Sequence, residues 1–122
     1  FPLPVRLRIF TVMEIDFKRA KDAKVFNDRR RLAKEYGKLA SVIERRMAFL
    51  VAAPNLAAVP HTPPTRRHLL KGNFASCYAV DLNGNYRLVF EAAETPMPET
   101  DDGGIDLVKV KTIRILDVRD YH

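Results

Sequence analysis

The dipeptide Asn83-Gly84 lies between two runs of alternating apolar residues. Both residues tolerate a positive φ, so this arrangement is the strongest short-range signal for a β-hairpin. The apolar positions of its two arms are Phe74, Tyr78, Val80 and Leu82 before the turn, and Tyr86, Leu88 and Phe90 after it. Arg87 is out of phase with the second arm and therefore projects from the opposite face. Residues 66–91 thus predict the middle of an antiparallel sheet that carries polar side chains.

Helical patterns precede this hairpin. Period-two alternation predicts a first strand over residues 5–17, and residues 18–26 follow as a short helix. Asn27 and Asp28 are good N-cap residues for a helix over 29–36, with Gly37 at its C′ position. Apolar residues at three- and four-residue spacing then predict a longer helix that ends near Ala53-Pro54: Leu39, Val42, Ile43, Met47 and Leu50. Two antiparallel helices joined at Gly37 would cover one sheet face.

The remaining segments complete the predicted architecture. Residues 55–65 form a proline-rich connector to a strand over 67–71, and 94–104 form an acidic loop without structural periodicity. Residues 107–118 predict a last strand, whose apolar phase changes near Thr112, indicating a bulge or burial on both faces. This order predicts an α+β fold, a small antiparallel sheet with two N-terminal helices packed on one face.

Length and composition predict a single domain over residues 1–122. A single cysteine excludes an internal disulfide framework, and no apolar run approaches the ~18 residues of a membrane-spanning helix. The N-terminus lacks a signal-peptide pattern, so we expect a cytoplasmic protein without a membrane partner. The sequence starts with Phe1, and Met13 is an alternative start that would make residues 1–12 an N-terminal extension.

The charge is positive and unevenly distributed. The net charge is +6, and residues 18–46 carry eleven Lys or Arg against four Asp or Glu. Residues 91–106 carry six acidic residues and no basic ones. Charge runs usually form solvated helix faces, but three further cations at Arg66, Arg67 and Lys71 extend this imbalance. A polyanionic partner, above all a nucleic acid, is therefore favoured.

Several motifs together resemble one family. They are Met-Glu-Ile-Asp-Phe at 13–17, the two helices, His-Leu-Leu-Lys-Gly at 68–72, Asn-Tyr-Arg-Leu-Val-Phe at 85–90 and Asp-Tyr-His at 120–122. In this order they resemble a HigB-type toxin of the RelE/ParE superfamily of bacterial toxin–antitoxin systems. The resemblance covers residues 13–122. The chain departs from it in Tyr86, where tryptophan is common, in the acidic insert before the last strand, and in residues 1–12.

This resemblance implies a RelE-like fold and a ribosome-dependent mRNA endonuclease that inhibits translation and needs no cofactor. It implies a cognate antitoxin with a helix-turn-helix fold, and operator DNA bound only through that antitoxin. The family's active-site positions match His68, Asp120, Tyr121 and His122, and Arg87 matches an arginine that contacts the scissile phosphate. Arg66, Arg67 and Lys71 would add positive potential for the RNA backbone.

The residue types suit metal-free RNA cleavage. A base and an acid are needed as the 2′-hydroxyl attacks phosphorus and the 5′-oxygen leaves, and histidine serves in either role. We favour His122 on the 2′-oxygen side and His68 towards the leaving group, although the sequence does not assign acid and base. Arg87 offers a fork for phosphate oxygens, Tyr121 can stack a base, and Asp120 can orient a histidine.

The same residues can also have purely structural roles. A lone histidine in a strand is more often a packed or surface residue, Arg87 can be a cross-strand ion-pair partner, and a C-terminal Tyr-His can be a frayed end. Cys77 is expected to be a small buried residue under a helix. His61 is expected to be exposed, and no closely spaced ligand pair supports a metal site.

Two other functions compete with the endoribonuclease. The first is a toxin of the same fold that poisons DNA gyrase, as the ParE branch does. The second is a non-catalytic co-repressor that binds DNA with its antitoxin. The positive charge fits all three functions, so only the histidine, arginine and Asp-Tyr-His set distinguishes them.

Overall fold

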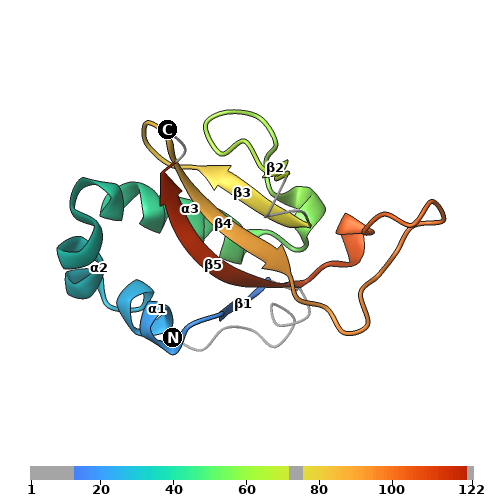
Figure 1. Ribbon diagram of the computed structural model, residues 1–122, viewed down its shortest axis with the longest axis horizontal. Coiled ribbons are helices and arrows are strands. Elements are labelled where there is room, and N and C mark those ends of the chain that lie inside the picture. Colours follow the sequence, from blue (N-terminus) through green and yellow to red (C-terminus); the bar gives the residue numbers. More distant parts are fainter. Residues whose placement is uncertain (1–12, 72–75, 121–122) are drawn as a thin grey trace, which may run out of the picture.

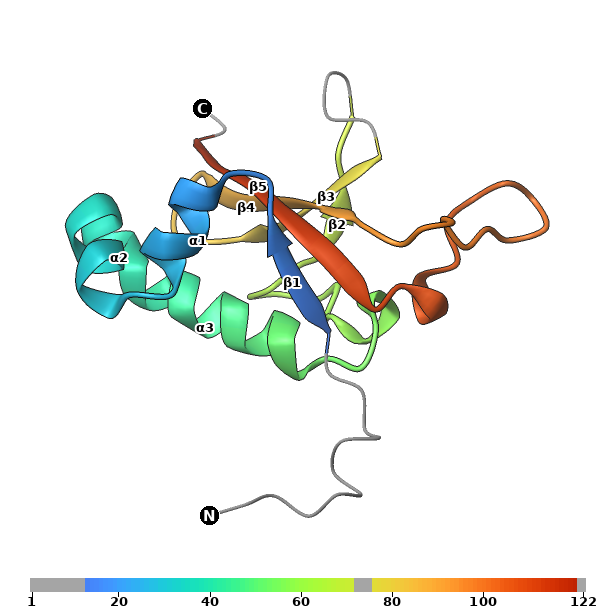
Figure 2. The ribbon, with the colours of Figure 1, turned by 90° about the horizontal axis from the view of Figure 1, so that it is seen from below.

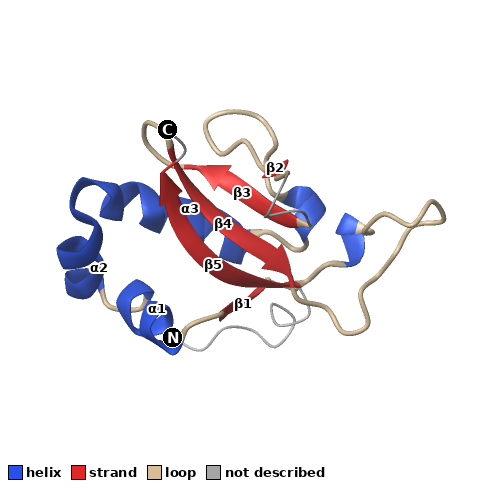
Figure 3. Ribbon diagram, in the orientation of Figure 1, coloured by secondary structure: helices blue, strands red, loops and turns tan. Residues whose placement is uncertain are grey.

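The computed structural model describes residues 13–71 and 76–120 (Figure 1). Its strands are β1 (Glu14–Phe17), β2 (His68–Leu69), β3 (Cys77–Asp81), β4 (Tyr86–Ala92) and β5 (Thr112–Asp120). Its α-helices are α1 (Ala20–Phe26), α2 (Arg29–Tyr36) and α3 (Ala40–Ala52), and short 3₁₀ helices span Gly37–Leu39, Leu56–Ala58 and Leu107–Lys109. No helix within these two ranges is long and apolar enough to cross a membrane. Figure 3 shows the helices and strands separately coloured.

The strands form one five-stranded sheet in the order β1-β5-β4-β3-β2. β2, β3, β4 and β5 pair in antiparallel fashion, whereas β1 pairs with β5 in parallel. Residues 18–111 connect β1 to β5, a much longer connection than the roughly dozen residues that a parallel pair needs. The α+β fold class predicted from the sequence is confirmed, with a sheet that is mostly antiparallel.

The predicted hairpin is the centre of this sheet. β3 and β4 pair from Cys77 with Glu91 to Asp81 with Arg87. Of the two turn residues, only Gly84 has a positive φ, at 61°, so the turn uses the freedom of glycine and not that of Asn83. Leu88 and Phe90 are fully buried on one face, and Arg87 projects from the other, as predicted. Phe74 lies outside the described residues.

The α2 helix begins and ends where capping residues predict. The Asp28 side chain accepts hydrogen bonds from the backbone N–H groups of Arg30 and Arg31 at the start of α2. Gly37 follows α2 with a φ of +55°, a conformation that favours glycine. Local sequence therefore determines both ends of α2.

One face of the sheet packs against helices. α3 crosses this face, whereas α1 and α2 lie together beyond one end of the sheet (Figures 1 and 2). The predicted helical layer is thus present, but the member that covers the strands is α3. The largest fully buried side chains of the described residues are Phe90, Leu32, Ile43, Leu50, Leu56, Leu88, Ile113, Ile115, Val42, Val59, Val80 and Val89.

The last strand differs from its prediction. Residues 107–109 form a 3₁₀ helix, and β5 begins only at Thr112. Val108 and Val110, whose alternation suggested a strand, therefore lie before it. A bulge does occur, but at Leu116: Phe90 pairs with Ile115 and Val89 with Asp117. The extra residue reverses the phase of everything after it, so Asp117 and Arg119 lie on the face opposite Ile115.

The acidic loop is closed by local contacts. Glu99 and Ile105 form an isolated bridge, and the backbone N–H of Thr100 donates to the carbonyl oxygen of Gly104 at 2.7 Å. In Figures 1 and 2 this loop projects at the end of the molecule opposite α1 and α2. It follows the end of β4 and is therefore distant along that strand from Arg87.

The N-cap of α2 provides a stability test. Asp28→Ala removes the acceptor of two backbone N–H groups, and we expect it to lower the free energy of unfolding by about 1 kcal/mol. Asp28→Asn keeps a capping oxygen and is expected to lose less than about 0.5 kcal/mol. Urea unfolding followed by circular dichroism checks both. Equal losses in the two variants would show that the cap is unimportant.

Candidate functional site

The sheet face opposite α3, which we call the open face, carries most of the sheet's charged side chains. Strand alternation and pairing place on it His68, Cys77, Ala79, Asp81, Arg87, Val89, Glu91, Arg114, Asp117 and Arg119. Ala79 and Val89 are fully buried, although they do not belong to the core cluster between sheet and helices. They form an apolar floor in the middle of a polar face.

His68 lies on β2 at the edge of this floor, because it pairs with Ala79. Its Nδ1 is 2.7 Å from the carbonyl oxygen of Arg66. A carbonyl oxygen only accepts, so Nδ1 must carry the hydrogen of this contact. The neutral ring therefore presents its lone pair at Nε2. The backbone thus selects Nε2 as the nitrogen that exchanges protons.

Asp81 binds two arginines on the open face. Arg66 donates to its carboxylate from Nε at 2.6 Å and from Nη2 at 3.0 Å. Arg87, the cross-strand partner, places its Nε 3.0 Å from Oδ1. The hydrogen bond with Asp81 raises the pKa of Arg66. Two guanidinium groups thus share one carboxylate, a geometry that orients both side chains.

Arg66 reaches this position through an unusual backbone conformation. Its φ is +48°, in the left-handed region that residues other than glycine seldom adopt. One residue thereby supplies both the carbonyl oxygen that holds His68 and a guanidinium that binds Asp81. From strand spacings, the Cα atoms of His68 and Arg87 are about 12 Å apart across the face. Both side chains therefore flank the same floor.

Some predicted site residues lie elsewhere. Arg67 donates from Nε to the carbonyl oxygen of Val59 at 3.0 Å and so points towards the connector and not onto the open face. Lys71 is exposed beyond the end of β2. Tyr121 and His122 lie outside the described residues, so the predicted meeting of His68 with His122 stays a prediction.

Asp120 is placed differently from the expected facing arrangement. It pairs with Tyr86 and alternates with Arg119, which pairs with Arg87. Alternation therefore puts Asp120 on the side of Val118 and Arg119 on the open face. Without the bulge at Leu116 the two residues would exchange faces. The expectation for Asp120 rests on the resemblance to the toxin family and not on strand alternation.

The sequence-based reasoning missed Asp81 and Arg119. A hairpin turn at Asn83-Gly84 places Asp81 opposite Arg87, so the pair could have been found by counting across the turn. The position of Arg119 depends on the bulge and has no such signal. The ion-pair alternative for Arg87 is present in the structure, and Arg87 makes this contact on the open face.

No group of three or more His, Cys, Asp or Glu residues within 13–71 and 76–120 is arranged to hold a metal ion. His61 is exposed in the connector, as expected. Cys77 is not under a helix, contrary to expectation: it is half-buried on the open face, and burial raises the pKa of its thiol.

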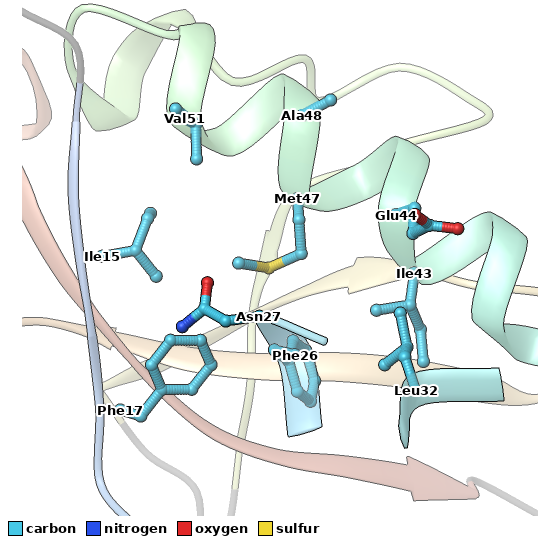
Figure 4. Close-up of a pocket in the computed structure, with 10 residues that line it drawn as sticks. All are labelled: Ile15, Phe17, Phe26, Asn27, Leu32, Ile43, Glu44, Met47, Ala48 and Val51. Carbon is cyan, nitrogen blue, oxygen red and sulfur yellow. The ribbon is translucent and has the colours of Figure 1, made fainter. Parts of the chain in front are cut away.

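A separate groove lies on the helical side of the sheet. It has a volume of about 430 Å³ and lies between β1 and the helices (Figure 4). Figure 4 shows Ile15 and Phe17 on one wall and Met47 and Val51 of α3 on the other. Asn27 and Glu44 are its polar lining residues. This apolar lining does not suit a phosphate or a proton-transfer reaction, which leaves the open face as the candidate site.

Comparisons with known proteins bear on the fold. A YoeB/ParE toxin from Agrobacterium tumefaciens has a similar structure, with a TM-score of 0.53 and 10% sequence identity over 90% of this chain and 100% of that chain. The chain has the fold of a YoeB/ParE toxin. No protein-family model matches the sequence, and no curated protein matches it either. At this identity the similarity establishes the fold, and the chemistry depends on the open face.

The shared carboxylate of Asp81 gives a second test. Asp81→Asn leaves the guanidinium groups of Arg66 and Arg87 beside a neutral amide. We expect the free energy of unfolding to fall by about 1–2 kcal/mol at low salt. The loss should shrink at 1 M NaCl, because salt screens the repulsion between the two cations.

Glu44→Gln is the matched control, since it removes a carboxylate paired with the exposed Arg29 at 3.1 Å. Exposed pairs contribute little, so a loss below about 0.5 kcal/mol is expected. Urea unfolding at both salt concentrations compares the two variants. The same loss in both, with the same salt dependence, would contradict the central position of Asp81.

Proposed function

We propose that this protein is the toxin of a toxin–antitoxin pair and that it cleaves mRNA on the ribosome, as HigB-type toxins do. The observation that carries the proposal is the open face, where His68 and the arginines Arg66, Arg87 and Arg119 surround one apolar floor. The toxin fold supports the first half of this proposal. The polar residues of that face support the second.

The proposed reaction needs no metal. The 2′-oxygen attacks the adjacent phosphorus and loses its proton to a base, while the 5′-oxygen leaves and receives a proton from an acid. The products are a 2′,3′-cyclic phosphate and a 5′-hydroxyl. Each proton transfer assisted by a positioned side chain typically contributes ~10²–10⁴-fold to the rate.

His68 would exchange its proton through Nε2, since Nδ1 is bound to the carbonyl oxygen of Arg66. This contact suits both protonation states: the Nδ1 hydrogen is retained whether the ring is neutral or cationic. His68 can therefore act as acid or base without rearranging. As our own assignment, we place His68 at the leaving group and His122 at the 2′-oxygen.

Arg87 and Arg66 would stabilise the charge that develops on the phosphorane. Both guanidinium groups bind Asp81, so their orientation is set before RNA arrives. Preorganised cations stabilise a transition state without reorganising during the reaction. Lys71 would contribute to RNA binding through its charge, and Tyr121 through stacking on a base. Arg67, which points towards the connector, is not assigned to this binding.

The proposed partners follow from the same assignment. They are mRNA in the ribosome, a cognate antitoxin with a helix-turn-helix fold, and operator DNA through that antitoxin. We propose no cofactor and no membrane partner. A cytoplasmic location would match these partners.

A gyrase-poisoning toxin of the ParE kind is the second candidate. The observation that favours it is the ion pair between Arg87 and Asp81, which engages an arginine that the nuclease reaction would use. The similar solved structure is likewise named for both toxin types. A gyrase poison does not require the pair His68 and His122.

Substitution of His68 tests the nuclease. His68→Ala is expected to lower the rate of mRNA cleavage by about 10²–10⁴-fold, because the proton carrier at Nε2 is lost. Mapping of mRNA 5′ ends after induction in cells measures this loss. His61→Ala, at an exposed histidine of the connector, is the control and should cleave like the wild type.

The double variant His68→Ala/His122→Ala separates the two candidates. Loss of both mRNA fragments and growth arrest supports the nuclease. Growth arrest that persists in the double variant, together with stabilised gyrase–DNA complexes, would instead support the gyrase poison. Urea unfolding of each variant confirms that it is folded.

A further inference from the structure

A cavity on the open face has no role in the chemistry proposed above. Its volume is about 620 Å³, within the ~300–1,000 Å³ typical of ligand pockets. It lies where β1 leads into α1, next to β3, β4 and β5. Its lining residues are Phe17, Lys18, Arg19, Cys77, Glu91, Arg114, Leu116 and Asp117.

This cavity adjoins the candidate active site. Cys77 pairs with Glu91, and both lie two residues along their strands from the floor residues Ala79 and Val89. Two residues of a strand span about 7 Å, so Glu91 lies about 13 Å along β4 from Arg87. A ligand that contacts both places must be extended along the strands. A single-stranded nucleic acid has this shape.

The pair formed by Glu91 and Arg114 presents donors and an acceptor together. Nη1 of Arg114 donates to Oε2 of Glu91 at 2.8 Å. Within the described part of the chain, no hydrogen bond reaches Oε1 of Glu91, or Nε and Nη2 of Arg114. The pair can therefore accept from one group and donate to its neighbour.

This pattern matches the edge of a nucleobase. Adenine, cytosine and guanine each present an amino donor beside an acceptor, and carboxylates and guanidinium groups recognise such edges. Uracil carries no amino group, and its one donor, N3–H, lies between two carbonyl oxygens that a carboxylate repels. Phe17 and Leu116 add apolar surface to the same cavity, which suits the face of an unpaired base.

Lys18 supplies a charge for the backbone of such a ligand. It is exposed and forms no ion pair with any described residue. Arg19, in contrast, is bound to Asp22 at 2.7 Å and lies 3.6 Å from Asp117. Among the cations that line the cavity, Arg19 and Arg114 are paired with carboxylates of the described residues, whereas Lys18 is not.

We propose that this cavity is a second RNA subsite, which holds one unpaired nucleotide of the strand to be cleaved. Glu91 and Arg114 read a base that carries an amino group, and Lys18 binds the adjoining phosphate. The identity of the ligand as RNA rests on the proposed function. The reading of the base rests on the geometry of the cavity.

The test uses 2′-O-methyl oligonucleotides of six cytidines or six uridines, which cannot be cleaved because the attacking hydroxyl is blocked. Fluorescence anisotropy with the full chain should show oligocytidine bound about tenfold more tightly than oligouridine. Arg114→Gln should remove this preference. Equal binding of both oligonucleotides by the wild-type protein would overturn the proposal.

Charge reversal tests the phosphate contact. Lys18→Glu should lower the slope of log Kd against log salt by about 0.7, the value for one phosphate of a single strand. Lys38→Glu is the matched control, because Lys38 is exposed on the 3₁₀ helix between α2 and α3. Equal weakening by both variants would indicate unspecific attraction and contradict the subsite.

Cys77 reports where the oligonucleotide binds. Iodoacetamide alkylates the thiolate with loss of iodide, and bound oligocytidine should slow this reaction severalfold, because Cys77 lines the cavity. An unchanged rate at saturating oligocytidine would overturn the location.

The two proposals fail separately. If the preference for cytidine is present but His68→Ala still cleaves mRNA, the catalytic role of His68 fails and the subsite stands. If cleavage requires His68 but the preference is absent, the subsite fails and the nuclease stands.

Discussion

Asp81 is the residue on which the arrangement of the open face depends. Its backbone N–H donates to Thr65 at 2.8 Å, and its carbonyl oxygen accepts from Nε of the buried Arg46 at 2.7 Å. Its carboxylate binds Arg66 and Arg87. This one residue at the end of β3 is therefore bonded to four segments: the connector over residues 55–65, α3, the residues just before β2, and β4. Asp81 is half-buried, and its backbone and carboxylate are hydrogen-bonded or ion-paired to four different segments, so its position is strongly determined.

The sequence predicts those parts of the fold that local chemistry determines. Asp28 and Gly37 mark the ends of α2, and the Asn83-Gly84 turn sets the register of β3 and β4. The end of β5 was not predictable in this way. Its bulge at Leu116 depends on pairing with β4 and on Arg19, which donates to the carbonyl oxygen of Leu116 at 3.3 Å. One such residue exchanges the faces of Arg119 and Asp120, and with them part of the predicted site.

Most charged side chains of the open face are paired with an opposite charge on the same face. Asp81 compensates two arginines, Glu91 compensates Arg114, and Asp117 lies near Arg19 and Arg119. The net positive charge of the chain therefore does not appear there as an undivided basic patch. A carboxylate that binds a guanidinium group weakens its attraction for an anionic ligand but fixes its orientation. Such fixed orientations favour selective recognition. Fixed orientation matters more than raw charge for discriminating one nucleotide from another.

The place of β5 within the sheet also bears on how the chain folds. β5 is the last described strand in sequence, yet it lies between β1 and β4 and pairs with both. β1 has no other partner among the described strands, so it can pair only with a segment about a hundred residues downstream. During synthesis the sheet cannot close until residues 112–120 have left the ribosome. Contacts of such long sequence separation form late and slowly, so a nascent chain of this fold would remain without its completed open face until β5 has been synthesised.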